Sequence, residues 1–348
     1  MVKLESLKGD ISTLRFEDGY SGNDWQQSVS KPNEHLRVAK RKVNGKDVYN
    51  MIQAKWGKGD QLLTLTGGAS ACTTLIVWDA SVAAKQRLII PENHWQLCSA
   101  IEKEQGKFVA CGGLHNWVEV YSLDDAYKDP YTDPVMSLRQ HDGYIADLEF
   151  VNGSKNMITA SGDSQCILWE IESGTATEVF SGHDGDVVGV TVNPTNPSLF
   201  ASGGIDNKIK LWDIRTGKSE QDFNVNTSDG ELNYVAFHPN GNSLVGSVAE
   251  FGSVIFDAKK GSEPQKKLTV PGTYDCSMSQ FSKSGRLLFT AYEDGSAYAF
   301  DIMSAEPKAY SLNGTKKSKI KGQFLDVHPD GYALALGDAS QVAVVLHF

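Results

Sequence analysis

A short signature recurs along the chain at nearly constant spacing: an apolar residue, then an aromatic ring, then a polar or acidic residue. Full copies are centred on Trp78, Trp169 and Trp212, weaker ones on Tyr121, Phe256 and Phe300, and a worn copy closes the chain at Leu346-His347-Phe348. The successive separations are 43, 48, 43, 44, 44 and 47 residues. Repeats of this length are typical of small sheet modules that cannot bury their faces alone and therefore stack on one another.

The interior of one repeat, Ser181–Glu220, shows what each module contains. It holds three short β-type runs, separated by turn clusters at Asn193–Pro197 and Arg215–Lys218. An acidic residue stands six positions before the aromatic centre in several repeats, as at Asp163 and Asp206. The two registers together predict an all-β fold, a seven-bladed β-propeller of the WD-repeat type with four strands per blade, over residues 36–348.

A ring of blades must also close. We expect a strand at about Leu36–Val43 to pair with the last three strands, within Gln323–Phe348, because the first and last blades would otherwise expose an edge. Residues 1–35 form a short N-terminal extension. In it Leu4, Leu7, Ile11 and Leu14 fall at heptad spacing, which allows a short helix for a coiled coil, although only about two heptads are present.

Composition excludes several classes of protein. The 348 residues include 33 Lys and Arg against 43 Asp and Glu, a net charge of −10, which makes a poor general ligand for nucleic acid or anionic membrane. Five cysteines without a CxxC pair argue against a disulfide framework or a zinc ribbon. No signal-peptide core and no apolar run of membrane-spanning length is present. We therefore expect a cytoplasmic protein that reaches the inner face of the plasma membrane only through a lipidated partner.

Two sets of polar residues resemble a nucleophile, a base and an orienting acid, but they recur from one repeat to the next, whereas a catalytic set occurs once. We interpret them as buried hydrogen-bond chains that tie the turns of a blade to its inner strands. The sets are His141, Thr159, Asp163 and Trp169 in one repeat, and His183, Ser202, Asp206 and Trp212 in the next.

Other motifs are weak. Gly217–Ser219 resembles the end of a phosphate-binding loop but has Trp212 where that motif needs glycine. The eight histidines form no metal-binding pattern. Basic residues cluster at Lys316–Lys321 and, more loosely, at Arg37–Lys46; they either contact a phosphate or acidic partner or belong to a solvated loop and an exposed edge strand. The sequence predicts no metal, no cofactor and no enzymatic activity.

Four stretches carry a closer resemblance. They are Phe108–Leu114 (FVACGGL), Ser161–Trp169 (SGDSQCILW), Gly182–Val188 (GHDGDVV) and Phe281–Leu288 (FSKSGRLL). In these phrases the chain resembles the β subunit of heterotrimeric G proteins, and the resemblance runs from about Leu36 to Phe348.

The resemblance implies a scaffold for signal transduction. Such a protein would pair with a small γ subunit, bind a GDP-loaded α subunit, release it on nucleotide exchange and engage effectors through the same rim of the propeller. The rim residues that the resemblance carries over to this chain are Trp95, Leu97, Leu114, Asn116, Tyr144, Asp186, Glu231 and Asn233.

The chain also departs from the family pattern. Ala249 replaces an acidic residue, and about Ser340 a rim tryptophan is replaced, while Asn50 and Ile52 fall where the family has lysine and tyrosine. The long N-terminal helix that holds the γ subunit is reduced or absent. The alternative is therefore a general WD-repeat adaptor for an unrelated multiprotein complex.

Overall fold

The structure is a computed structural model. It describes residues 4–5, 36–37, 42–43, 46–47, 50–68, 71–81, 84–91, 95–124, 132–225, 230–270, 275–304, 307, 309–312, 323–331, 333–337 and 342–347. Every regular element in this part of the chain is a β-strand. No helix among the described residues is long and apolar enough to cross a bilayer.

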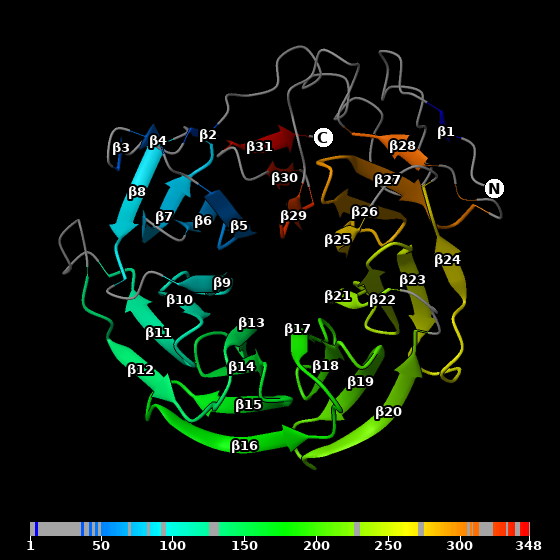
Figure 1. The fold of residues 1–348 in the computed structure, drawn as a ribbon, viewed down its shortest axis with the longest axis horizontal. Helices are drawn as coiled ribbons and strands as arrows, with labels where there is room; N and C mark the ends of the chain where they lie inside the picture. The colour runs from blue at the N-terminus through cyan, green and yellow to red at the C-terminus, as the bar shows by residue number, and fades with distance from the viewer. Residues whose placement is uncertain are drawn as a thin grey trace.

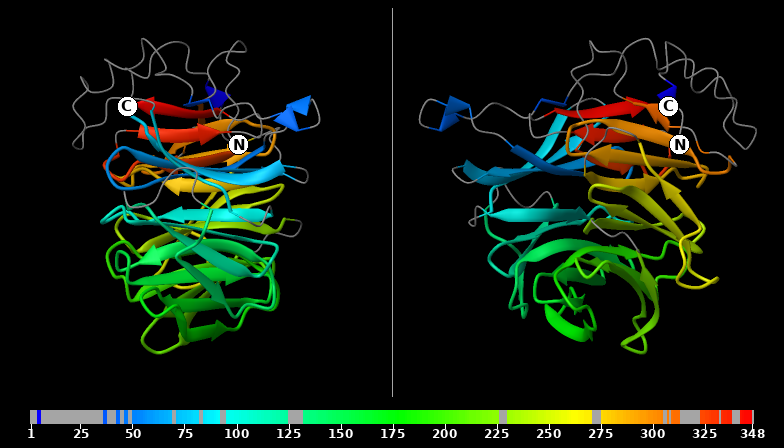
Figure 2. Two further views of the ribbon diagram at one scale, coloured as in Figure 1. Left: turned by 90° about the vertical axis from the view of Figure 1, so that its left-hand side faces the viewer. Right: turned by 45° about the vertical axis from the view of Figure 1, so that its right-hand side comes forward.

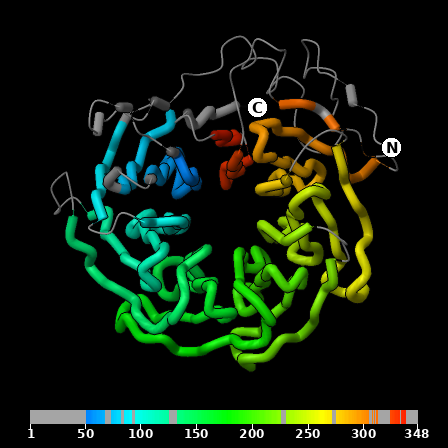
Figure 3. Tube along the Cα trace, viewed as in Figure 1, coloured from blue at the N-terminus to red at the C-terminus, as the bar shows by residue number. Residues whose placement is uncertain are grey.

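The strands form sheets arranged like blades around a central axis, and the chain passes from one sheet to the next around the ring (Figures 1 and 3). Seen from the side, the ring is a disc with two broad faces (Figure 2). Within each sheet the strands that follow one another along the chain are antiparallel. The architecture is thus the all-β propeller that the repeat period predicts.

Six of these sheets have four strands. From the axis outward they are β5 (Asn50–Trp56), β6 (Gln61–Gly68), β7 (Ala71–Asp79), β8 (Ala84–Ile89); β9 (Gln96–Ile101), β10 (Phe108–Gly113), β11 (Trp117–Ser122), β12 (Met136–Arg139); β13 (Ile145–Val151), β14 (Asn156–Ser161), β15 (Gln165–Glu170), β16 (Thr175–Ser181); β17 (Val187–Val192), β18 (Leu199–Gly204), β19 (Lys208–Asp213), β20 (Lys218–Asn224); β21 (Leu232–Phe237), β22 (Ser243–Val248), β23 (Gly252–Asp257), β24 (Lys266–Leu268); and β29 (Phe324–Val327), β30 (Ala333–Gly337), β31 (Val342–His347), β2 (Leu36–Arg37).

The prediction of seven four-stranded blades is wrong, because the structure contains six of them. The remaining large sheet has five strands: β25 (Cys276–Phe281), β26 (Leu287–Tyr292), β27 (Ala297–Asp301), β28 (Ala309–Ser311) and β1 (Leu4–Glu5). Strand β1 pairs with β28 in parallel, with Leu4 opposite Ala309. The physical reason is that an outermost strand presents unpaired amides and carbonyls, which can accept a further strand.

The ring closes by pairing the two ends of the described chain. Leu36 and Arg37 lie antiparallel to Ala343 and Val342 in the sheet order β2-β31-β30-β29. This confirms the expected closing strand, but the strand is shorter than predicted. Residues Lys42–Val43 form β3 and pair instead with β4 (Lys46–Asp47) in a separate two-stranded hairpin. Of the heptad leucines, Leu4 lies in β1; Leu7, Ile11 and Leu14 lie outside the described residues.

Neighbouring sheets pack through large aromatic side chains. Between the β13–β16 and β17–β20 sheets, Phe180, Phe200 and Trp212 are buried in one cluster. The rings of Phe200 and Trp212 are nearly parallel, at 14° with centroids 6.2 Å apart, and Phe180 meets Phe200 edge to face at 4.8 Å. Aromatic pairs of this kind add about 0.5–1.5 kcal/mol beyond their burial. The sheet-to-sheet contacts therefore hold a large part of the hydrophobic core.

Hydrogen bonds from inner-strand side chains to the main chain of the next sheet also join the blades. An inner strand has an edge facing the axis, so its main-chain groups need partners outside their own sheet. The contacts are Gln53 Oε1 with Ser99 N (2.7 Å), Asp147 Oδ2 with Val190 N (3.2 Å), Asn233 Nδ2 with Cys276 O (3.0 Å), Gln280 Oε1 with Val327 N (3.1 Å) and Asp326 Oδ2 with Trp56 N (2.6 Å).

The turns between the first and second strands of several sheets carry a second set of ties. His328 Nε2 contacts Gly59 O at 2.9 Å, and His238 Nε2 contacts Gly285 O at the same distance. In His328 the Asp330 amide donates to Nδ1 at 3.0 Å, so the neutral ring with its proton on Nε2 satisfies both contacts. Burial lowers the pKa of His328 and favours this neutral form.

Candidate partner-binding rim

The rim residues implied by the resemblance all lie on one face of the disc. In each blade the first strand begins at this face, and the loop between the second and third strands returns to it, because successive strands are antiparallel. Trp95, Tyr144, Asp186 and Glu231 precede the inner strands β9, β13, β17 and β21, and Leu114 lies in the loop between β10 and β11. The propeller thus brings together residues that are far apart in the sequence.

The loops around β9 and β10 expose three large apolar side chains. Trp95 is 49% exposed, Leu114 50% and Leu97 37%. The Leu114 amide donates to Trp95 O at 2.9 Å, which holds the two loops side by side. Gly113 permits this approach, because a Cβ at that position would lie 1.9 Å from Trp95 O. The result is an apolar area that is presented to solvent on a well-defined backbone.

The next part of the rim is polar. The Tyr144 hydroxyl donates to Asp186 Oδ2 at 2.8 Å and links the start of β13 to the start of β17. Burial, reinforced by Asp186, raises the pKa of Tyr144 to about 12, so the hydroxyl remains a donor at neutral pH. The Tyr144 ring lies against Gly162, where a Cβ would come within 2.3 Å of the ring. Tyr144 is therefore positioned from both sides.

The other residues of the predicted rim differ in what they offer a partner. Asn116, which has a positive φ of 65°, donates from its side chain to Asp142 O at 3.1 Å. Glu231 is exposed at the start of β21. Asn233 is half-buried and donates to Cys276 O of the next sheet. The amide of Asn233 therefore joins two sheets, and Glu231 is the more accessible of this pair.

Ile205 belongs to the same face, and the sequence analysis missed it. It is 38% exposed, and its amide donates to Asp186 O at 2.9 Å. The sequence does contain a signal for it: Ile205 follows Gly203-Gly204 as Leu114 follows Gly112-Gly113 in an earlier repeat. We call Trp95, Leu97, Leu114, Tyr144, Asp186 and Ile205 the rim patch.

The two repeated polar sets form continuous hydrogen-bond chains inside their blades. In the first, Trp169 Nε1 donates to Thr159 Oγ1 at 2.9 Å, that oxygen lies 2.7 Å from His141 Nε2, and His141 Nδ1 lies 2.7 Å from Asp163 Oδ2. Burial would raise the pKa of Asp163, but bonds from His141 and from main-chain amides outweigh it and lower the pKa.

The second set has the same geometry. Trp212 Nε1 donates to Ser202 Oγ at 2.8 Å, Ser202 Oγ lies 2.7 Å from His183 Nε2, and His183 Nδ1 lies 3.0 Å from both carboxylate oxygens of Asp206. The indole occupies the hydroxyl from one side and the imidazole from the other. Such an arrangement fixes the blade interior and leaves no open position for a substrate.

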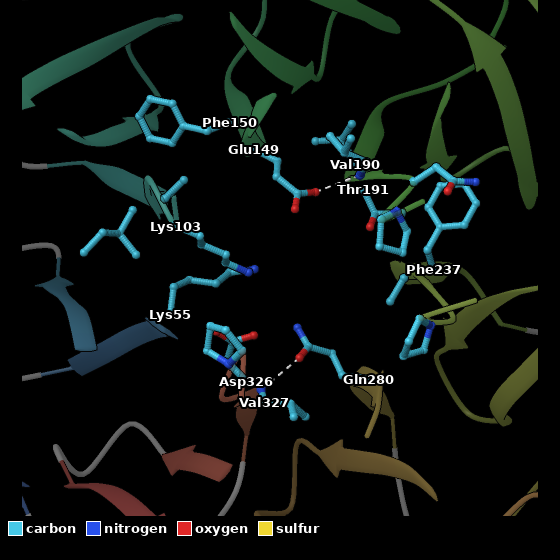
Figure 4. Close-up of a pocket in the computed structure, with 18 of the residues that line it drawn as sticks. Lys55, Lys103, Glu149, Phe150, Val190, Thr191, Phe237, Gln280, Asp326 and Val327 are labelled. Atoms are coloured by element: carbon cyan, nitrogen blue, oxygen red, sulfur yellow. Dashed lines mark hydrogen bonds between the residues drawn. The ribbon is translucent and has the colours of Figure 1, made fainter. Parts of the chain in front are cut away.

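The central channel holds a polar cluster that the sequence analysis did not find. Figure 4 shows the side chains of Lys55 and Lys103 pointing into the channel, with Gln280 and Asp326 beside them. Lys55 Nζ donates across the channel to Tyr234 OH at 3.2 Å, and Gln280 Nε2 donates to the same oxygen at 3.3 Å. This bridge of Lys55, Tyr234 and Gln280 connects β5, β21 and β25 through the middle of the ring.

The chemistry of this cluster is that of a structural bridge. Burial would lower the pKa of Lys55, but Tyr234 and nearby carboxylates, including Asp147 and Asp326, outweigh it and raise the pKa. The amine is therefore protonated at neutral pH and is not a nucleophile. Asp147 and Asp326 already accept main-chain amides of the next sheets. The cluster thus fastens sheets to one another across the axis.

The thiols and potential metal ligands add no reactive centre among the described residues. Cys98, Cys111, Cys166 and Cys276 are free and buried. Burial raises the pKa of each, that of Cys166 to about 12, which keeps these thiols protonated. No group of three or more His, Cys, Asp or Glu side chains in the described part of the chain could hold a metal ion.

Fold and repeated hydrogen-bond sets together define a WD-repeat propeller, and comparison with known proteins agrees. The family profile described as "WD domain, G-beta repeat" matches residues 132–170 and 174–213. The chain is 34% identical over 282 residues to a guanine nucleotide-binding protein subunit beta of Nicotiana tabacum, covering 77% of this chain and 74% of the relative. The chain belongs to the family of guanine nucleotide-binding protein β subunits, as a divergent member.

Other relatives give the same result. A guanine nucleotide-binding protein subunit beta of Solanum tuberosum is 34% identical over 283 residues, covering 77% of this chain and 74% of the relative. One of Zea mays is 31% identical over 285 residues, covering 77% of this chain and 73% of the relative. The resemblance stated from the four sequence stretches is therefore confirmed.

Proposed function

We propose that this chain is a non-catalytic scaffold that binds a GDP-loaded G-protein α subunit, and effectors in turn, through the rim patch. The observation that supports this most directly is the exposure of Trp95, Leu97 and Leu114 beside the ordered Tyr144–Asp186 pair. Large aromatic side chains with few rotatable bonds are the usual anchors of protein interfaces. Asp186 supplies a carboxylate that a Lys or Arg of the partner can meet.

The test is a binding titration of the full chain with a GDP-loaded α subunit. Truncating an anchor residue at an interface costs about 2 kcal/mol or more, so Trp95→Ala and Leu114→Ala should each weaken binding about 30-fold. The matched control is Val135→Ala, because Val135 is 41% exposed near the start of β12, on the opposite face. Unchanged affinity in both rim variants, or equal loss in the control, would refute the proposal.

A γ subunit and membrane attachment are further parts of this proposal. We propose that a γ-like helix pairs with the chain, and that a lipid group on a partner brings it from the cytoplasm to the inner face of the plasma membrane. The N-terminal stretch that would carry the helix contact, like the basic stretch Lys316–Lys321, lies outside the described residues. Co-purification of a helical peptide of under about 100 residues with the native protein would support γ pairing, and cell fractionation checks the location.

One observation favours a second candidate, a WD-repeat adaptor with no link to a GTPase. Ala249 stands where the family has an acidic residue, and its amide bonds to Glu231 O at 2.9 Å, so the substitution alters the rim itself. Mass spectrometry of the proteins that co-purify with the native chain separates the two candidates. A GTPase among them supports the first, and components of an unrelated complex without a GTPase support the second.

A further inference from the structure

A second pocket lies between the β21–β24 sheet and the β25–β28 strands, and it has a volume of about 650 Å³. Its walls are the turns between first and second strands at His238–Ser243 and Ser282–Leu287, together with Gln265 and Lys266 at β24 and Ile302 and Met303 after β27. All of these turns lie on the face opposite the rim patch, because they connect strands at the other ends. We call this the Lys266 pocket.

The charge of the Lys266 pocket is opposite to that of the whole chain. Its ionisable lining residues in the described part of the chain are His238, Lys266 and Arg286, and no carboxylate lines it there. The chain as a whole carries a net charge of −10. A cationic concavity on an acidic protein selects an anionic group by local complementarity.

The two cations are held in place by contacts that leave positive charge at the wall. Lys266 Nζ donates to Ile302 O and, at 3.3 Å, to Ser304 O, and both partners are neutral carbonyls. An ammonium has three donors, and these bonds use two of them. Arg286 is fixed by Asp301, with Nη2 at 3.0 Å from Oδ2. The positions of both groups are therefore set before any ligand arrives.

The rest of the lining suits a peptide that carries an anion next to an apolar side chain. The hydroxyls of Ser282 and Ser284, 3.2 Å apart, lie in the same turn as Arg286 and provide further hydrogen-bonding groups. Phe289 belongs to the apolar part of the wall, and Met303, which is 73% exposed, stands at the pocket's border. The turn is part of the Phe281–Leu288 stretch, whose polar residues the rim does not use.

We propose that the Lys266 pocket binds a segment of a partner protein in which a carboxylate or a phosphate stands beside an apolar residue. The anion meets Lys266 and the Ser282–Arg286 turn, and the apolar side chain packs on Phe289 and Met303. Since the pocket and the rim patch lie on opposite faces, one chain can hold this partner and a rim partner at the same time.

The experiment uses the full chain and four pools of fluorescent nonapeptides with randomised flanking positions and the centre Leu-X-Leu. X is phosphoserine, Glu, Gln or Lys. The phosphoserine or the Glu pool should bind at least tenfold more tightly than the Gln and Lys pools, and the stronger of the two shows which anion the pocket prefers. Failure of both anionic pools to bind, or equal binding of the Lys pool, would overturn the proposal.

Two variants locate the binding. Lys266→Gln should weaken the anionic pool at least tenfold, and Met303→Glu should do the same by placing a negative charge at the border of the pocket. The matched control is Lys283→Gln, which removes the same charge from the same turn at an exposed residue outside the pocket, and should change affinity by less than twofold. Unchanged binding in both pocket variants refutes the site. Affinity for a GDP-loaded α subunit is measured in parallel, so failure of the rim proposal is seen separately.

Discussion

Removing one hydroxyl from the second repeated polar set tests whether these sets stabilise the blades. Ser202 is fully buried, and its Oγ receives the indole N–H of Trp212 and contacts Nε2 of His183. In Ser202→Ala both partners keep their places in a dry interior and lose their common partner. A buried polar group left without a hydrogen bond costs about 1–3 kcal/mol. Two such groups give an expected loss of about 2–4 kcal/mol in the free energy of unfolding.

The assay is urea unfolding followed by tryptophan fluorescence, compared with wild type under the same conditions. The control is Ser219→Ala, because Ser219 lies exposed on β20 of the same blade and bonds only to Asp222 at the surface among the contacts described. Surface substitutions of this kind usually change stability by less than about 0.5 kcal/mol. A Ser202→Ala variant as stable as this control would refute the argument.

A double variant sharpens the result. Trp212→Phe removes the indole N–H, so in that background Ser202→Ala orphans one group fewer. The loss in the double variant should therefore be smaller than the sum of the single losses by about 1 kcal/mol, a coupling typical of residues that share a hydrogen bond. Strict additivity would mean that the indole and the hydroxyl do not act as one unit.

Three further predictions follow from other contacts. A spectrophotometric titration should show Tyr144 ionising near pH 12, with Asp186→Asn returning its pKa toward 10; because the folded pKa lies above the unfolded one, stability should fall as the pH rises from about 10 to 12. The pKa of His328 is lowered on folding, so stability measured by thermal unfolding should fall as the pH drops below about 6.5, and this part of the pH dependence should vanish in His328→Asn. Gly113→Ala should displace the Trp95 loop and abolish rim binding while circular dichroism still reports a β-sheet fold, since the added Cβ would lie 1.9 Å from Trp95 O.

Sequence reasoning found the parts of the fold that repeat. The period of the aromatic centres and the turn clusters identify the strands of the propeller, because each blade must satisfy the same packing and hydrogen-bond demands. It failed for β1, which is only two residues long and therefore carries no alternating pattern. The strand joins the sheet through main-chain atoms alone, which any sequence supplies, so the five-stranded sheet could not be foreseen.

The candidate site shows the same division. The exposed apolar residues Trp95, Leu97 and Leu114 follow from the family resemblance, and Ile205 could have been found by aligning the Gly-Gly turns of two repeats. The bridge of Lys55, Tyr234 and Gln280 had no such signal. Its members are separated by up to 225 residues in the chain and share no motif, and only closing the ring brings them to one axis.

The pairing of β2 with β31 has a consequence for how the protein is made. The outer strand of that sheet leaves the ribosome near the start of synthesis, at Leu36–Arg37, while its partner at Ala343 and Val342 leaves almost last. Early blades can gain their local hairpins during translation, but the clasp between the two ends has to wait for the stop codon. Contacts between such distant segments slow folding. The nascent ring therefore stays open throughout elongation, and a chain that loses its final few residues has nothing to fasten to.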